Sequence, residues 1–348
     1  MEKTDLNKSE KRLLNNQSRP KQIGSKSNFK NKREIILSLI YENLKTDYVP
    51  GAFFMHFGNG NFFGESAVNN HLGFFRNADL DILKIQYEQK YPVVHEIQKP
   101  KDWKEIPFFK KDFYADQLKV VKALVKKGKK DALVLATVYS PLQFASQVTG
   151  KKHHVNHLNE DPELVKKGLE IINQSTLIYV KECMKLGVDG FFQVTQGGES
   201  NRFVSDSVFE NYIKPFDLII GQEISTGYQC NILHIHTTIG KYKNYSAFKD
   251  YPGHIVNCEF ELENGPISIN ELYKLFDRPI MGGLSRNGII VDGTKDEIYN
   301  SVRKVISKAP EKFLIGANCT IPSHTKWDNV KVAMDAAHNF FKNDRRCS

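Results

Sequence analysis

The chain has 348 residues, of which 40% are hydrophobic, and a formal net charge of +9. This length suits one large α/β domain or two ordinary ones, and no apolar run approaches the roughly 20 residues that a membrane span needs. A secretory leader and a disulfide framework are not expected, because the N-terminus lacks an apolar core and the five cysteines are scattered and odd in number. We therefore expect a reduced, cytoplasmic protein without a membrane partner.

The positive charge is concentrated at the N-terminus. Residues 1–33 contain ten Lys or Arg and three Asp or Glu, which places +7 of the net charge there and +2 in the rest of the chain. This segment is rich in Asn, Ser, Lys and Gln and has little to bury, so it is predicted to be a disordered, solvated tail. The body, residues 34–348, is nearly neutral, which argues against specific nucleic-acid recognition.

Helical and strand-like patterns alternate from residue 34 onward. The first is an amphipathic helix, EIILSLIYENL, and the longest helix is predicted to begin at Asp161–Pro162 and to end at Gly187. Apolar strands separated by helices indicate a parallel sheet, and eight strands in one domain fit a closed (β/α)₈ barrel. A doubly wound sheet is the alternative, although GNGNFFG at 58–64 lacks the G-x-G-x-x-G spacing. The predicted strands are 51–57, 80–87, 131–139, 190–196, 231–237, 254–260, 279–285 and 313–319.

Polar residues gather at the C-terminal ends of these strands, where barrel enzymes place their chemistry. Those residues are predicted to contact substrate. They are His56, Lys84, Tyr139, Gln196, Arg202, Glu259 and Arg286.

His234 and His236 stand out in the stretch ILHIHTTIG. Side chains alternate along a strand, so both imidazoles share one face, and Cys319 at the end of the last strand would reach the same mouth. Two imidazoles and a thiolate are a suitable zinc ligand set with a fourth position open. The alternative is a hydrogen-bonded histidine pair beside a merely buried cysteine. His153, His154 and His157 are expected in a solvated loop, and Cys183 in the core.

Several stretches together resemble the uroporphyrinogen decarboxylase superfamily, from about Arg33 to the C-terminus. REIILSLIYENLKTDYVPGAFFMHF is similar to the family's first helix and strand, and SPLQFASQVTG to its G-P-x-T-L-A segment. GVDGFFQVTQ with SDSVFENYIKPFD resembles its fourth strand and the following helix. ILHIHTTIG aligns with L-H-x-C-G, PIMGGLSRNGIIVDGTKDEI with G-G-(I/L)-D … G-T-x-E-E, and FLIGANCTIPSHTKWDNV with G-x-G-C-x-(I/V)-P-x-x-T-P-x-E-N. The resemblance implies a (β/α)₈ barrel.

The superfamily has two main branches. One decarboxylates the acetate side chains of uroporphyrinogen without a cofactor and grips them through arginines in R-Q-A-G-R, where this chain reads FMHFGNGNFFGE without arginine. Another transfers methyl groups between a corrinoid and a thiol, using zinc held by H-x-C and a later Cys. The matching residues here are His234, His236 and Cys319, with histidine in place of the middle cysteine.

The resemblance therefore predicts zinc-assisted methyl transfer, with His234, His236 and Cys319 as metal ligands and catalytic residues and a corrinoid, or a corrinoid protein, as partner. The alternatives are a metal-free porphyrinogen decarboxylase with atypical anchors and a non-catalytic barrel that binds a small molecule. The oligomeric state, a homodimer included, stays open.

Overall fold

The computed structural model describes residues 31–42, 48–58, 60–150 and 153–344. The first 30 residues of the predicted basic tail lie outside this part. The last two residues of the tail, Lys32 and Arg33, belong to helix α2 (Lys32–Tyr41). This helix begins where the Asn31 side chain accepts a hydrogen bond from the Glu34 N–H.

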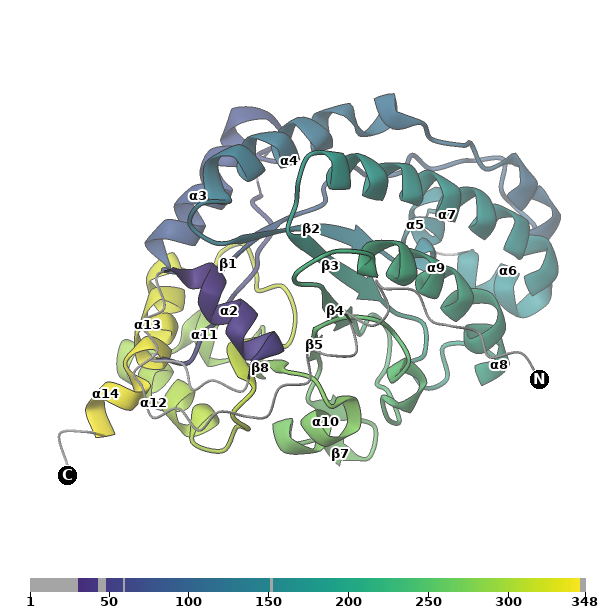
Figure 1. Cartoon of the computed structure of the whole chain (residues 1–348). Helices are drawn as coiled ribbons and strands as arrows, with labels where there is room; N and C mark the ends of the chain where they lie inside the picture. The colour runs from purple at the N-terminus through teal and green to yellow at the C-terminus, as the bar shows by residue number, and fades with distance from the viewer. Residues whose placement is uncertain (1–30, 43–47, 59, 151–152, 345–348) are drawn as a thin grey trace, which may run out of the picture.

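The centre of the molecule is a curled sheet of seven parallel strands, in the order β1-β2-β3-β4-β5-β8-β9 (Figure 1). All seven coincide with predicted strands, because short, doubly buried apolar runs are typical of parallel sheets. The strands are β1 (Ile82–Ile85), β2 (Leu133–Tyr139), β3 (Gly190–Thr195), β4 (Ile232–Ile235), β5 (Ile255–Cys258), β8 (Ile280–Leu284) and β9 (Phe313–Ala317), and a separate two-stranded ribbon joins β6 (Glu261–Leu262) to β7 (Gly265–Pro266).

The predicted first strand, 51–57, is the exception, because it forms only two isolated parallel bridges, Gly51 with Ile315 and Met55 with Ile321. Three residues lie between the two bridges on the side of segment 51–57 and five lie between them on the β9 side. The two extra residues on the β9 side interrupt the ladder. The expectation of a regular strand at 51–57 was thus wrong, since a bulge in the partner breaks the pairing.

This segment nevertheless lies between the two edge strands. The Ala52 N–H donates to the Ile315 carbonyl at 3.0 Å, on the β9 side. On the β1 side, the Asp81 N–H donates to the Gly51 carbonyl at 3.0 Å, and the Gln86 side chain donates to the Met55 carbonyl at 2.7 Å.

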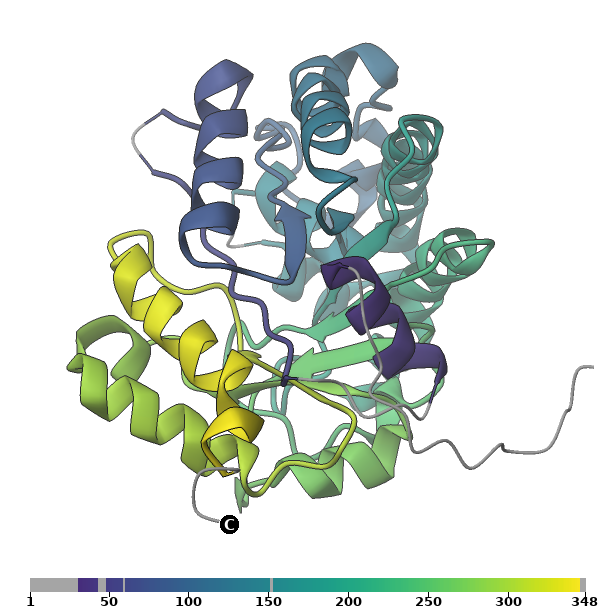
Figure 2. The same cartoon turned by 60° about the vertical axis from the view of Figure 1, so that its left-hand side comes forward.

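Helices surround the outside of the sheet (Figures 1 and 2). Neighbouring helices pack in the order α9, α7, α4, α3, α13 and α12, so this layer also continues from α3 to α13 across segment 51–57. Within the described ranges, no helix has both the length and the apolar character needed to cross a bilayer. The helices are α3 (Gly64–Asn77), α4 (Ala115–Gly128), α5 (Pro141–Val148), α6 (His154–Glu160), α7 (Pro162–Lys185), α8 (Asp206–Val208), α9 (Lys214–Ser225), α10 (Ile269–Phe276), α11 (Ile289–Asp292), α12 (Lys295–Ile306), α13 (Trp327–His338) and α14 (Phe340–Asp344), with short turns η1 (Pro100–Glu105), η2 (Lys111–Tyr114), η3 (Phe209–Ile213) and η4 (Ser246–Phe248).

The inside of the curled sheet has its own apolar core. Ile82, Leu133, Phe192 and Ile232 belong to it, together with residues of segment 51–57 and β9. Ile36 and Leu39 of α2 are part of the same cluster. Helix α2 therefore covers the interior at one end. Its polar contacts show that this is the end where the strands begin. Its residues reach the segments before the strands: Lys32 to Leu80, Arg33 to Asp189 and Gln229, and Tyr41 to His254.

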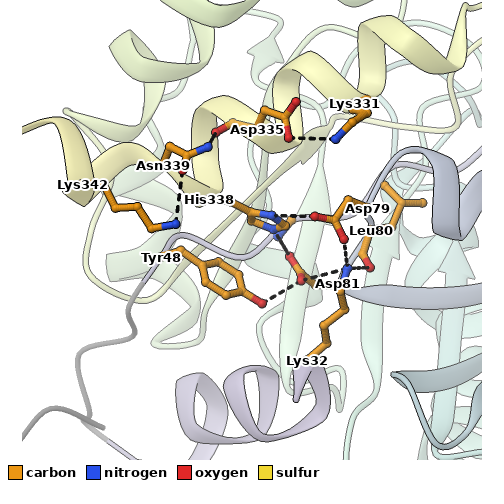
Figure 3. A network of polar contacts seen from close by, with 11 residues as sticks. Lys32, Tyr48, Asp79, Leu80, Asp81, Lys331, Asp335, His338, Asn339 and Lys342 are labelled. Carbon is orange, nitrogen blue, oxygen red and sulfur yellow. Dashed lines mark hydrogen bonds and ion pairs between the residues drawn. The ribbon is translucent and has the colours of Figure 1, made fainter. Parts of the chain in front are cut away.

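A polar network fixes this end of the molecule (Figure 3). The buried Asp81 carboxylate accepts hydrogen bonds from the Tyr48 hydroxyl at 2.9 Å and the Gly51 N–H at 2.8 Å, and pairs with His338 Nε2 at 2.9 Å. Lys32 reaches Asp79 at 2.6 Å. The network joins α2 to α13, near the two ends of the described chain.

Candidate metal and substrate site

His234 and His236 lie at the C-terminal end of β4. Ile232 belongs to the interior core, so the alternation of the strand turns both histidines toward the same interior. The His234 ring is buried and stacks on Phe192, with ring centroids 5.1 Å apart. The His236 N–H donates to the Thr195 carbonyl at 2.8 Å, which ties the end of β4 to β3.

Cys319 comes to the same point from beyond β9. Its Sγ lies 3.5 Å from His234 Nε2 and 3.4 Å from His236 Nδ1. In the described part of the chain, these three residues are the group whose ligand atoms all lie within 4.8 Å of one another. Cys319 lies within the bulge opposite segment 51–57, and such bulges re-aim side chains.

The pKa shifts of His234 and Cys319 are in the direction that favours a metal. Burial, and then the nearby Lys84 charge, lower the pKa of His234 to about 3, so its imidazole is neutral near pH 7. Burial alone would raise the pKa of Cys319, but the hydrogen bond and charge of His236 and the charge of Arg286 outweigh it, and the net pKa is lowered. A neutral imidazole, as in His234, and a thiol that loses its proton readily, as in Cys319, are forms that bind zinc.

The spacing also fits a tetrahedral ion. Zn–S near 2.3 Å and Zn–N near 2.0–2.1 Å give a nitrogen–sulfur edge of about 3.6 Å. Both observed nitrogen–sulfur distances, 3.5 and 3.4 Å, are close to this value, and all three ligand atoms lie within 4.8 Å of one another. Three protein ligands leave one coordination position for another molecule.

Arg286 and Glu259, both predicted to contact substrate, reach the turn that carries Cys319. Arg286 Nη1 lies 3.5 Å from Cys319 Sγ, and the Arg286 N–H donates to Asn318 Oδ1 at 2.7 Å. The Asn318 side-chain amide donates to Glu259 at 2.5 Å. Asn318 was missed by the sequence reasoning, although its place beside Cys319 was a usable signal.

Lys84 lies beneath the cluster in the interior. Its ammonium lies 4.9 and 4.6 Å from the ring centroids of Phe54 and Phe192 and donates to Gln86 Oε1 at 2.6 Å. Burial lowers the pKa of Lys84 to about 7, against the opposing charges of Cys319 and Glu88. Lys84 thus places a titratable cation under the site.

Tyr139 ends β2 on the same side of the sheet. Burial, and then the charges of Glu88 and Cys319, raise the pKa of its hydroxyl, which therefore stays protonated. Its ring meets Tyr87 and Phe144 edge to face.

Gln196 and Arg202 hold loops together. Gln196 donates to Gln143 and accepts from the Thr238 hydroxyl. The buried Arg202 guanidinium pairs with Glu199 at 2.8 Å, and Glu199 also accepts from backbone N–H groups of the loops after β3 and β4. The ion pair occupies Arg202 in positioning these loops.

His56 pairs with a residue that the sequence reasoning missed. Its Nδ1 lies 2.7 Å from Glu88 Oε1, just beyond β1. Glu88 lies two positions after Gln86 and four after Lys84. Residues at this spacing face the same side of a strand, so the sequence offered a signal that Glu88 points the same way as Lys84.

A cavity of about 780 Å³ opens beside the cluster. Thr237 and Asn318, which adjoin His236 and Cys319 in the sequence, are among its lining residues, together with Glu259, Ser285 and residues of α10 and α12. The lining residues thus include the sequence neighbours of His236 and Cys319 but not the three metal-ligand candidates themselves.

Of the three histidines expected in a solvated loop, His153 is exposed, as predicted, but the other two are not. His154 and His157 are buried rather than solvated. The Trp103 indole donates to His157 Nδ1 at 2.9 Å, and His157 Nε2 lies 3.0 Å from the Gln98 carbonyl. These bonds explain the burial and occupy both nitrogens of His157. Cys183 is buried as predicted.

Comparison with known proteins identifies the family to which this chain belongs. The family described as Uroporphyrinogen decarboxylase (URO-D) matches residues 83–340, more than half of the chain. The chain belongs to this family, which confirms the resemblance seen in its motifs. No curated protein matches it in sequence.

Solved structures with similar folds include methyltransferases. A methyltransferase from Methanosarcina mazei has a TM-score of 0.69 at 15% identity, covering 89% of this chain and 99% of its own. A B12-independent methionine synthase from Shewanella sp. W3-18-1, in complex with selenomethionine, has a TM-score of 0.51 at 13% identity, covering 86% and 100%. A putative vitamin-B12 independent methionine synthase from Listeria monocytogenes has the same TM-score and identity, covering 78% and 85%. At these identities the similarity concerns the fold.

Proposed function

We propose that this protein is a zinc-dependent methyltransferase that moves a methyl group from a corrinoid-type donor to a thiol. The observation that carries the proposal is the convergence of His234 Nε2, His236 Nδ1 and Cys319 Sγ at separations that fit one tetrahedral ion. The family and the methyltransferases among its structural neighbours support the reaction class.

A zinc ion held by the three residues would lower the pKa of a substrate thiol and orient its sulfur. The residues around it have separate tasks. His234, neutral because it is buried, keeps a lone pair available, and Arg286 stabilises the charge on Cys319. Transfer then forms a bond between the substrate sulfur and the methyl carbon, while the bond from that carbon to the donor breaks and leaves its electron pair on the donor.

We further infer that segment 51–57 completes an eight-stranded barrel, because it bonds to β9 and to the β1 side. Closure would make the C-terminal mouth the place where thiol and donor meet.

Porphyrinogen decarboxylation has less support. It requires cationic anchors for several carboxylates, whereas Arg202 is paired with Glu199 and Arg76 is exposed on α3, which leaves Arg286, beside Cys319, as a single arginine at the site among the three. Incubation with uroporphyrinogen tests this alternative, and formation of coproporphyrinogen would favour it.

Elemental analysis tests the proposal. The purified chain should contain one zinc per molecule, and the variant with His234→Ala, His236→Ala and Cys319→Ala should contain none. His95→Ala, a change at an exposed histidine, is the control and should keep the metal. Stoichiometric zinc that survives the triple change would refute the site. Methylation of homocysteine by methylcobalamin, with wild type and triple variant compared, then tests the reaction.

A further inference from the structure

The His56–Glu88 pair has the geometry of an oriented base. Nδ1 of His56 lies 2.7 Å from the carboxylate, and the side chains are 43% and 10% exposed respectively. A carboxylate partner fixes the tautomer, so Nδ1 carries the hydrogen and Nε2 keeps its lone pair. No residue in the described part of the chain hydrogen-bonds to Nε2, so this nitrogen is free to accept a proton.

Both residues face the mouth that holds the metal-ligand candidates. Ala52 and Phe54 belong to the interior core, and His56 is the next residue with the same orientation. Glu88 continues the interior-facing row that begins with Ile82. Met55 bridges to Ile321, two residues beyond Cys319, so the dyad and the cysteine lie on adjacent segments.

The groups between the two sites connect them. Lys84 and Tyr139 are each within electrostatic range of both Glu88 and Cys319. Lys84 lies below in the apolar interior, and the Tyr139 hydroxyl is protonated.

His71 of α3 is the other histidine close to the dyad, and it cannot act as the base. Its Nδ1 lies 2.7 Å from the Ala67 carbonyl and its Nε2 accepts from the Gln86 N–H at 3.0 Å. Burial lowers its pKa to about 4. In this corner of the mouth, His56 is the imidazole with an available nitrogen.

We propose that His56, oriented by Glu88, accepts the proton of the substrate thiol as the thiol enters the metal site. The inference rests on the proposed function and adds the proton acceptor. The S–H bond breaks, its electron pair stays on sulfur, the proton forms a bond to His56 Nε2, and Glu88 stabilises the resulting imidazolium. Because the imidazole is partly exposed, it then releases the proton to water.

Cobalt substitution separates this step from methyl transfer. The protein is loaded with Co²⁺ and mixed with homocysteine near pH 7 in a stopped-flow spectrometer, and the thiolate-to-cobalt charge-transfer absorption is followed. His56→Ala and Glu88→Gln are compared with wild type and with His95→Gln, an exposed control. Cobalt content and final band intensity are measured for each protein, which shows that the site has folded.

We expect His56→Ala to slow the appearance of the band by about a hundredfold, the usual share of a general base. Added imidazole should restore much of the rate in His56→Ala, and Glu88→Gln should show a smaller loss without rescue. Rates equal to wild type, or a slow His56→Ala that imidazole does not accelerate, would overturn the dyad alone. A wild-type protein that takes up no cobalt, or develops no band, would overturn the proposed function and this inference together.

Discussion

Asp217 of α9 is a buried carboxylate. One oxygen accepts from the Thr195 and Tyr251 hydroxyls, whereas Oδ1 is buried without a hydrogen-bond partner. Burial raises the pKa of Asp217 to about 7, in spite of these hydrogen bonds. The charged form of this residue therefore destabilises the fold.

Replacing Asp217 with Asn should remove this destabilisation, and the resulting gain in the free energy of unfolding should depend on pH. A pKa raised above its unfolded value means that the stability contributed by Asp217 is full below about pH 4 and is lost as the pH rises toward 7. The free energy of unfolding of Asp217→Asn relative to wild type should thus increase between pH 4 and 7, by on the order of a few kcal/mol. Urea unfolding of both proteins at several pH values measures this difference. A difference that stays constant with pH would contradict it, and Asp116→Asn, at an exposed site, is the control.

At the scale of the elements, segment 51–57 packs closely against β9 at Gly51. A Cβ at Gly51 would lie 2.4 Å from the Ile315 side chain and 2.9 Å from its carbonyl oxygen. Gly51→Ala should therefore push the segment off β9 and lower the free energy of unfolding by about 1–3 kcal/mol, the usual cost of overpacking. Chemical denaturation checks the value. Gly58→Ala is the matched control, since a Cβ there meets nothing closer than 3.9 Å, and equal losses in the two variants would be inconsistent with this account.

The same segment shows where sequence reasoning reaches its limit. Apolar runs predicted the seven regular strands, and Asp161 with Pro162 predicted the start of α7, because these signals are local. The alternation on β4 predicted that His234 and His236 would point the same way. The bulge beside Cys319 and the pairing of His56 with Glu88 depend on register between distant segments, which no local pattern encodes.

At the scale of the whole molecule, the network of Figure 3 joins the two ends of the described chain where the strands begin. Asp81→Asn should lower the free energy of unfolding by about 3 kcal/mol, because it removes a buried charge that Tyr48, Gly51 and His338 all engage. Thermal and urea unfolding measure the effect. Asp335→Asn, which alters an exposed pair with Lys331, should leave stability nearly unchanged. Comparable stabilities for Asp81→Asn and wild type would show that the network contributes little.

Helix α2 seals the interior where the strands begin. Among the described residues, this leaves the C-terminal ends of the strands as the side from which substrates would reach the proposed metal site. Under the proposed function, the thiol binds before the bulkier corrinoid-type donor covers the opening. The methylated product then dissociates after the demethylated donor. A compulsory order of entry and exit, visible in product-inhibition patterns, is the kinetic consequence of this helix.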